Sequence, residues 1–266
     1  MKKIIITVAL ISSVFLSCHK NAITGSRALT LLPESEMMAM SFTQYDQFLA
    51  EHPPLPDNDG RVKVVKGCGV RIQHAVEQFY NDKGLSQDLN GFKWAFNVVN
   101  DNAVNAWCMP GGKVVVYTGL LPVTQDEQSL AIVMGHEIAH AIARHGNQRM
   151  SQGILVQTGG TVLSVALSQK PAATQQLFMQ SFGIGSQLGM LSYSRKHETE
   201  ADKMGLIFAA MAGYNPEVAV TFWQRMSQVG GGQKPPELLS THPSDERRIR
   251  DLQAFMPEAK KYYKAQ

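Results

Sequence analysis

The feature that most constrains this chain is a pair of histidines inside a long apolar stretch. Residues 130–143 read Leu-Ala-Ile-Val-Met-Gly-His-Glu-Ile-Ala-His-Ala-Ile-Ala, and their only polar side chains are those of His136, Glu137 and His140. A stretch this apolar predicts a helix at the centre of the fold. Burying three ionisable groups is costly unless they are paired or bind a metal. The pattern therefore indicates a buried functional site.

The spacing of these residues favours a zinc site. Residues four apart on a helix differ by about 40° in direction and about 6 Å in height, so His136 and His140 share one face and can reach one ion. Glu137 completes an H-E-x-x-H pattern, in which the glutamate is a general base. A catalytic zinc needs a third protein ligand. The best donors lie in residues 194–202, where Glu198 and Glu200 both remain possible from the residues alone.

Composition limits the class of protein. The chain has 266 residues, of which 44% are hydrophobic and 18% charged, which is enough for one compact domain with a real core. The formal net charge is +3, and no stripe of Lys and Arg with interleaved aromatic residues is present in the sequence. We therefore expect no nucleic-acid partner.

The first residues resemble an export signal. Lys2 and Lys3 precede an apolar run over residues 4–16, which is too short to span a bilayer but has the length of a signal-peptide core. The run ends in Phe-Leu-Ser-Cys, similar to a bacterial lipobox with Cys18 as the lipidated residue. We expect a signal peptide over 1–17, a lipidated irregular tether over 18–32 and a metallopeptidase domain over 33–266. An ordinary cleaved signal with a stray cysteine is the alternative.

Periodicity and turn residues predict an α+β fold that is mainly helical, with one small β-sheet. We expect helices at 34–50, 62–80, 130–143, 192–212, from 215 and at 244–255, strands at 92–99 and 113–118, a turn-rich connection at 102–112, and helical pieces within 148–190. In an oxidising compartment, Cys68 and Cys108 either form a bridge or remain two unpaired thiols.

Four motifs together resemble the M48 (Ste24/HtpX/Oma1-like) metallopeptidases, and most of all their small exported bacterial lipoprotein members. HEIAH is followed by SRKHETEAD, with NAWCMPGG upstream and THPSDERRI downstream, so the resemblance runs from about residue 33 to 255. It implies a gluzincin-type fold in which H-E-x-x-H is followed by E-x-x-x-D. Only Glu198 has an aspartate four residues later, so the resemblance makes Glu198 the third zinc ligand. It gives Asp202 the role of accepting a hydrogen bond from a metal-bound imidazole.

The resemblance also implies further site residues. Residues 105–112 match the edge-strand segment that binds peptides by strand addition, so we expect Asn105, Gly111 and Gly112 to contact substrate; an ordinary turn is the alternative. His242 matches a position near the cleft, where it would donate to the oxyanion or occupy the open zinc position as a latent lid. A helix-cap or surface histidine is the other interpretation. Arg248 is expected to pair with the acidic groups around the metal.

Two histidines next to the motifs are expected to lie outside the site. His145 comes five residues after His140 and should face sideways from the metal on a continuous helix, and His197 should be exposed, because adjacent helical residues diverge by about 100°.

The expected function is that of a zinc-dependent metalloendopeptidase with one Zn²⁺ per chain. Its substrates would be proteins or peptides of a bacterial cell envelope in quality control, and the protein would be lipid-anchored and periplasm-facing. A periplasmic chaperone or assembly factor that uses the zinc cleft mainly for binding is the alternative. The 148–190 segment, between the two ligand-bearing stretches, is expected to cover the cleft.

Overall fold

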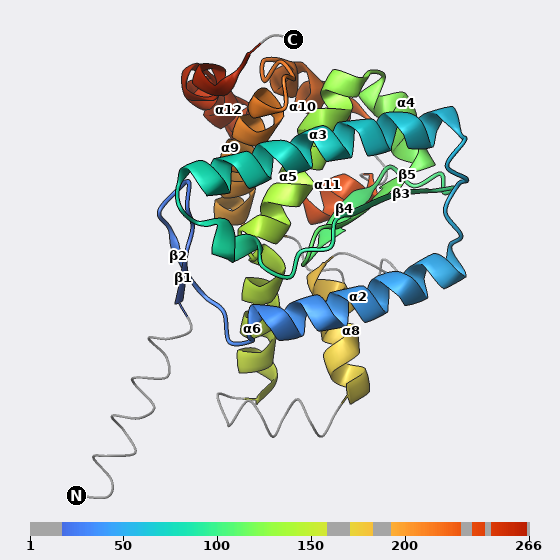
Figure 1. Ribbon diagram of the computed structural model, residues 1–266, viewed down its shortest axis with the longest axis vertical. Helices are drawn as coiled ribbons and strands as arrows, with labels where there is room; N and C mark the ends of the chain where they lie inside the picture. The colour runs from blue at the N-terminus through green and yellow to red at the C-terminus, as the bar shows by residue number, and fades with distance from the viewer. Residues whose placement is uncertain (1–17, 159–170, 183–192, 230–235, 243–245, 265–266) are drawn as a thin grey trace, which may run out of the picture.

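The structure is a computed structural model that describes residues 18–158, 171–182, 193–229, 236–242 and 246–264. The strands are β1 (Cys18–Lys20), β2 (Arg27–Leu29), β3 (Ala95–Val99), β4 (Ala106–Met109) and β5 (Lys113–Tyr117). The main helices are α2 (Glu34–Glu51), α3 (Gly60–Asp82), α4 (Leu121–Thr124), α5 (Glu127–Ile142), α6 (His145–Thr158), α8 (Pro171–Ser181), α9 (Arg195–Met211), α10 (Val218–Gln228), α11 (Glu237–Thr241) and α12 (Glu246–Ala259). The expectation of a mainly helical α+β fold with one small central sheet is confirmed (Figure 1).

Several sequence expectations concern residues outside the described ranges. The signal segment 1–17, the loop at 230–235 and two parts of the segment expected to cover the cleft, 159–170 and 183–190, lie outside the described residues. Among the described helices, none is both long enough and apolar enough to cross a membrane.

The central sheet has the strand order β3-β5-β4. β3 runs parallel to β5, whereas β4 is antiparallel to β5 and pairs Cys108 with Val114. The edge strand that the family resemblance implied for residues 105–112 is therefore present, within a region whose residues alone indicated a turn-rich connection. Gly111 and Gly112 reverse the chain between β4 and β5 with φ values of +79° and +81°, which side chains rarely tolerate. No strand of the described chain pairs with the outer edge of β4.

Both faces of this sheet are buried, and the alternation of side chains sorts them into two layers. Figure 1 shows α3 and α2 on opposite sides of the sheet. One face packs against α3 and α5 through Phe96, Val98, Ala106, Cys108, Val114 and Val116. The other face packs against α2, α6 and α8 through Val99, Trp107, Met109, Val115 and Tyr117. Cys68 and Cys108 are both buried and free, so the structure has two thiols and no bridge between them.

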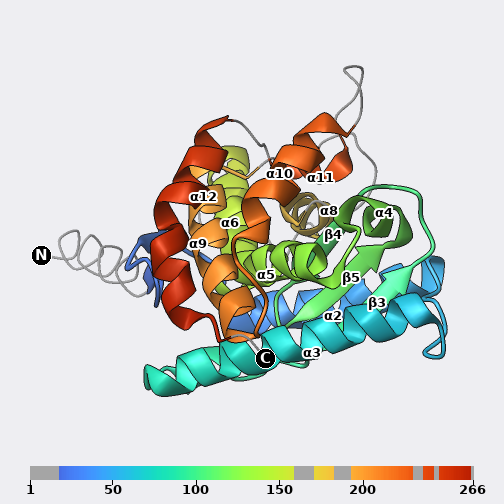
Figure 2. The same ribbon diagram turned by 90° about the horizontal axis from the view of Figure 1, so that it is seen from above.

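The helix with the H-E-x-x-H motif, α5, lies between the sheet and α9 (Figure 2). Where α5 crosses α9, both helices carry glycine. A Cβ atom added at Gly135 would lie 2.9 Å from the carbonyl oxygen of Gly205, and one at Gly205 would lie 2.8 Å from the backbone nitrogen of His136. The two backbones therefore touch, which brings the side chains of α9 next to the histidines of α5.

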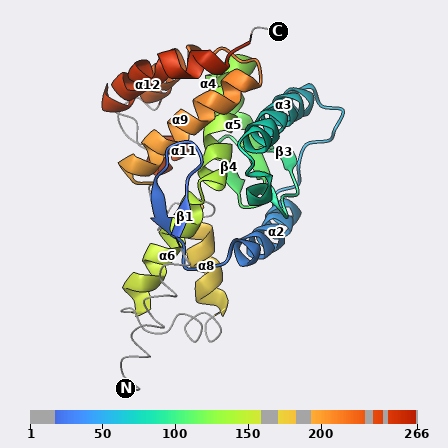
Figure 3. The ribbon, with the colours of Figure 1, turned by 60° about the vertical axis from the view of Figure 1, so that its left-hand side comes forward.

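The segment 18–32 is not the irregular tether expected from the sequence. β1 and β2 form an antiparallel ribbon, with Lys20 opposite Arg27, that lies beside α6 and α9 (Figure 3). Thr24 and Ser26 at its turn donate hydrogen bonds to the carboxylate of Glu200 on α9. The polar residues that suggested a tether are thus the ones that attach the ribbon to the domain.

Candidate metal centre

Four buried side chains from three parts of the chain converge on one point. His136 and His140 come from α5, Glu198 from the first turn of α9, and His242 directly follows α11. One ligand atom from each lies within 4.8 Å of the others. Asp126 and Ser194 cap α5 and α9 by accepting the backbone N–H of residues three positions later, which fixes where both helices begin.

The distances within this group are those of converging ligands. Nε2 of His136 lies 3.0 Å from Nε2 of His140. The Glu198 carboxylate faces both imidazoles, with Oε1 3.3 Å from Nε2 of His140 and Oε2 3.4 Å from Nε2 of His136. Nδ1 of His242 lies 3.0 Å from Oε1 of Glu198. Imidazole nitrogens and a carboxylate are the donors that zinc takes in catalytic sites.

A buried oxygen next to this group supports the fit to a metal. Oε1 of Glu137 is buried and has no hydrogen-bond partner among the described residues; Nε2 of His242 lies 3.5 Å from it. Burial raises the pKa of Glu137 above its ordinary value, and the nearby His242 and His136 oppose this effect. An unpaired carboxylate oxygen beside converging ligand atoms is suited to hold a water molecule and take its proton. The residues present therefore fit a zinc site.

Burial and neighbouring charges shift the pKa values of the ligand groups. Burial raises the pKa of Glu198, but His242 and Arg248 outweigh it and hold this pKa well below its usual range. Burial holds the pKa of His140 well below its ordinary value, so this imidazole is neutral. For His136, burial and Arg248 lower the pKa, but hydrogen bonds to Asp202 and Glu198 raise it to about 9.

Asp202 and Arg248 form a second layer behind His136. Oδ1 of Asp202 lies 2.9 Å from Nδ1 of His136, and Arg248 donates to both Asp202 oxygens at 2.8 and 2.7 Å. Nη1 of Arg248 also lies 3.1 Å from Glu198, and its guanidinium stacks 3.5 Å from the ring centre of Trp223. With Asp202 accepting from Nδ1, the Nε2 lone pair of His136 is free to face a metal.

The three residues expected to contact substrate lie on or beside β4. Asn105 is buried, and its carbonyl accepts the backbone N–H of Tyr117 at 3.1 Å. Gly111 and Gly112 form the turn after β4, where added Cβ atoms would lie 2.6 Å from the Phe42 ring and 2.5 Å from the Trp94 ring. Turn geometry and close packing account for both glycines, and none of their contacts joins them to the metal centre.

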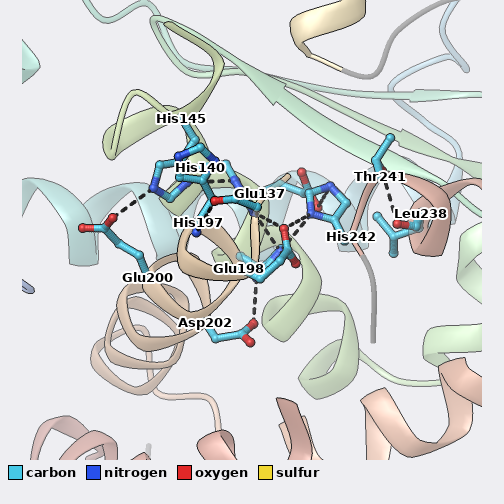
Figure 4. A network of polar contacts seen from close by, with 12 residues as sticks. Glu137, His140, His145, His197, Glu198, Glu200, Asp202, Leu238, Thr241 and His242 are labelled. Carbon is cyan, nitrogen blue, oxygen red and sulfur yellow. Dashed lines mark hydrogen bonds and ion pairs between the residues drawn. The ribbon is translucent and has the colours of Figure 1, made fainter. Parts of the chain in front are cut away.

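The expectation for His197 is wrong, whereas His145 is, as expected, not among the four converging ligand residues. His145 nevertheless contacts the centre, with Nδ1 2.9 Å from Nδ1 of His140. Arg144 takes a φ of +58° and breaks the helix between α5 and α6, so the period of α5 does not extend to His145. His197 is only 5% exposed; its ring stacks 4.4 Å from that of His145, and Nε2 lies 3.0 Å from the side-chain oxygen of Gln148. Figure 4 shows both histidines among the site residues.

Tyr193 is a site residue that sequence reasoning missed. Its ring centre lies 3.9 Å from that of His140. The Arg149 guanidinium carbon lies 3.5 Å from the centre of the Tyr193 ring. Burial raises the pKa of Tyr193, so the phenol stays protonated. The only signal in the sequence was its position directly before the SRKHETEAD segment.

Comparisons with known proteins agree with this geometry. The family model for Peptidase family M48 matches residues 70–256. The chain is 37% identical over 172 residues to mitochondrial metalloendopeptidase OMA1 of Schizosaccharomyces pombe, covering 64% of this chain and 49% of that protein. It is 33% identical over 255 residues to human mitochondrial metalloendopeptidase OMA1, covering 93% and 47%. It is 30% identical over 202 residues to the beta-barrel assembly-enhancing protease of Escherichia coli, covering 73% and 42%.

These relatives correct the expected location. The prediction of a bacterial cell envelope is contradicted, because the relatives from fission yeast, human, budding yeast and Arabidopsis are mitochondrial enzymes, although the bacterial protease also matches. That prediction rested on Lys2, Lys3, the apolar run over residues 4–16 and the Phe-Leu-Ser-Cys sequence that ends it. The chain spans about half the length of the curated relatives it matches. The family implied by the motifs is confirmed, and the chain belongs to peptidase family M48.

Proposed function

We propose that this chain is a zinc-dependent metalloendopeptidase with one Zn²⁺ held by His136, His140 and Glu198. The observation that carries the proposal is the unpartnered, buried oxygen of Glu137 beside three converging ligand atoms. A site used only to stabilise the fold needs no base. A chaperone that only binds in the cleft does not need this glutamate either, so its position favours the enzyme.

The chain's own residues divide the reaction between them. When bound, zinc supplies a Lewis acid for the scissile carbonyl and lowers the pKa of water. Glu137 takes the proton of the attacking water and delivers it to the leaving amine. Asp202 keeps the His136 proton on Nδ1, and Arg248 holds Asp202 in place through two hydrogen bonds. Burial of the whole group excludes bulk water from these proton transfers.

His242 has two possible roles in this scheme, an oxyanion donor or a latent fourth ligand. Its Nδ1 lies 3.2 Å from Nε2 of His136 and 3.0 Å from Glu198, within the ligand group. This position supports the second role: in the conformation described, His242 fills the place that the substrate carbonyl must reach. We infer that the segment carrying His242 moves before a peptide is cut.

The substrate side of the proposal rests on the sheet. An extended peptide would add to the outer edge of β4, where no strand of the described chain pairs, with Asn105, Gly111 and Gly112 at its ends. The substrate class we propose is damaged or misassembled protein, since extended segments are accessible only where a protein is not folded. The Escherichia coli relative, whose name describes enhanced assembly of beta-barrels, supports this class.

We also propose that the chain is attached to a membrane by lipid on Cys18 after removal of residues 1–17. The support is the apolar run over residues 4–16 and the Phe-Leu-Ser-Cys sequence that ends it. Mass spectrometry of the N-terminal peptide, compared between wild type and Cys18→Ser, tests this. An unmodified cysteine in the wild-type peptide would refute it. The expected division into a segment over 18–32 and a domain over 33–266 stays a prediction.

The test of the enzymatic proposal compares wild type with Glu137→Gln. Zinc content is measured by elemental analysis, and cleavage is measured on casein. We expect about one zinc per chain in both proteins and cleavage by the wild type alone, because the substitution removes the base but no ligand. Glu51→Gln, at an exposed position on α2, is the matched control and should cut like the wild type. Zinc in neither protein would refute the proposal, and equal cleavage by both would remove Glu137 from its role.

A further inference from the structure

A hydrogen-bonded chain runs outward from His140 to the N-terminal ribbon. Nδ1 of His140 lies 2.9 Å from Nδ1 of His145, and Nε2 of His145 lies 3.2 Å from Oε2 of Glu200. Oε1 of Glu200 in turn accepts hydrogen bonds from the hydroxyls of Ser26, at 2.6 Å, and Thr24. Figure 4 shows the rings of His140 and His145 side by side and Glu200 beyond them. Neither His145 nor Glu200 has a place in the mechanism described above.

Only one arrangement of protons allows every hydrogen bond between His140, His145 and Glu200 to form. Nε2 of His140 faces Glu198 and His136, so its lone pair must stay free for a metal and the proton must be on Nδ1. That N–H donates to Nδ1 of His145, which must therefore be unprotonated. His145 then carries its proton on Nε2 and donates it to Glu200. An ionised carboxylate at the end of the chain sets the tautomer of both rings.

The other histidine of α5 shows the same arrangement. His136 has the same kind of support on the opposite side of the centre, since Asp202 accepts from its Nδ1 at 2.9 Å. Each α5 histidine is thus backed by a carboxylate of α9, directly at His136 and through a second imidazole at His140.

We propose that His145 and Glu200 are positioning residues for His140, and that the ribbon residues Thr24 and Ser26 are the outer layer of the same metal centre. This inference rests on the proposed zinc function. Removing an acceptor behind a metal-bound histidine costs about 10–100-fold in metal affinity. A cavity of about 320 Å³ lies outside the ribbon contact and is lined in part by Thr24, Ser26 and Glu200. Loss of the two hydroxyls would therefore admit water to the carboxylate.

A purely structural interpretation is that Glu200 only fastens the ribbon to α9. The two interpretations predict changes in different measured quantities. Fastening affects the stability of the ribbon, whereas positioning affects zinc affinity and the tautomer of His140. Both quantities can be measured without any cleavage assay.

The experiment measures zinc affinity of the full chain by competition with a chromophoric chelator. His145→Phe keeps an aromatic ring to stack on His197 but removes the acceptor for His140, and we expect zinc binding about tenfold weaker or more. Glu200→Ala should weaken binding similarly, whereas Glu200→Gln, which keeps one acceptor oxygen for His145, should recover part of the loss. The double variant Thr24→Val with Ser26→Ala should lose less, about threefold to tenfold. Ser35→Ala, an exposed hydroxyl on α2, is the control and should bind like the wild type.

Histidine-ring ¹⁵N NMR provides the second readout. In the wild type, His140 should carry its proton on Nδ1, and in Glu200→Ala this single tautomer should become a mixture. Wild-type zinc affinity in both His145→Phe and Glu200→Ala would overturn the inference while leaving the proposed function intact. Absence of zinc binding in the wild type itself would overturn both. Should His145→Phe not fold, the Glu200 and ribbon variants decide the question.

Discussion

Nδ1 of His242 lies 3.2 Å from Nε2 of His136, so a residue 106 positions later in the sequence joins the ligand group of α5. Nε2 of the same ring lies 3.5 Å from the Glu137 carboxylate. One imidazole therefore contacts both a proposed ligand and the proposed base. With the latent role proposed for His242, this conformation is closed to a peptide carbonyl and its attacking water.

The first prediction concerns this closed state. His242→Ala should bind zinc more weakly than the wild type but cleave a short fluorogenic peptide faster. If the closed conformation holds about nine molecules in ten, removal of the side chain raises the competent fraction by about tenfold. Peptide cleavage at saturating zinc measures the effect. Loss of cleavage with zinc retained would instead assign His242 to the oxyanion.

Asp202→Asn tests the layer behind His136. The amide cannot balance the buried Arg248, which donates two hydrogen bonds to this carboxylate. Breaking a buried ion pair by removing one partner costs about 3–5 kcal/mol, and loss of the carboxylate should weaken zinc binding by about 10–100-fold. Urea unfolding and chelator competition measure the two effects. Asp251→Asn, whose carboxylate is partly exposed beside Arg247, is the control and should change neither by much.

The crossing of α5 and α9 gives a prediction about packing. Gly205→Ala adds a methyl group 2.8 Å from the backbone nitrogen of His136, so the helices must separate. Overpacking of this kind costs about 1–3 kcal/mol, and the shift also moves Glu198 away from the histidines. Gly67→Ala on α3, where an added Cβ meets nothing within 4 Å, is the matched control and should stabilise the fold by about 0.5–1 kcal/mol. Thermal unfolding of both variants and the wild type measures these changes in stability. A Gly205→Ala protein as stable as the wild type would show that the helix crossing can relax around the added methyl group.

The comparison of sequence and structure shows which features a local pattern can predict. The helix of residues 130–143 and the shared face of His136 and His140 follow from a regular period, and both were predicted correctly. The helical period gave the wrong direction for the His145 side chain, because a single left-handed residue, Arg144, interrupts the helix after α5. Gly146 directly follows His145, but neither this glycine nor the spacing shows that Arg144 takes the left-handed conformation.

Long-range contacts were equally hidden. Only the family resemblance indicated the edge strand β4. The residues alone indicated a turn, because the strand is four residues long and turn formers flank it, and pairing with β5 rather than its own propensity stabilises it. The ribbon of residues 18–29 looked like a polar tether because its hydroxyls find their acceptor, Glu200, more than 170 positions away. Contacts of that separation cannot be inferred from one sequence.

The last prediction concerns stability in acid. The pKa of Glu200 is about 2 in the folded protein, below the ordinary 4.5. A carboxyl whose pKa falls on folding contributes stability that is fully present above pH 4.5 and lost as the pH falls toward 2. The free energy of unfolding of the wild type should therefore exceed that of Glu200→Gln at pH 6, and the difference should shrink between about pH 4.5 and 2. Urea unfolding of the metal-free proteins across this pH range measures both free energies. Subtracting one from the other removes the contribution of the other titrating groups, which the two proteins share. A difference that stays constant with pH would mean that Glu200 is not held ionised by His145, Ser26 and Thr24, and the chain from the ribbon to His140 would lose its charged end.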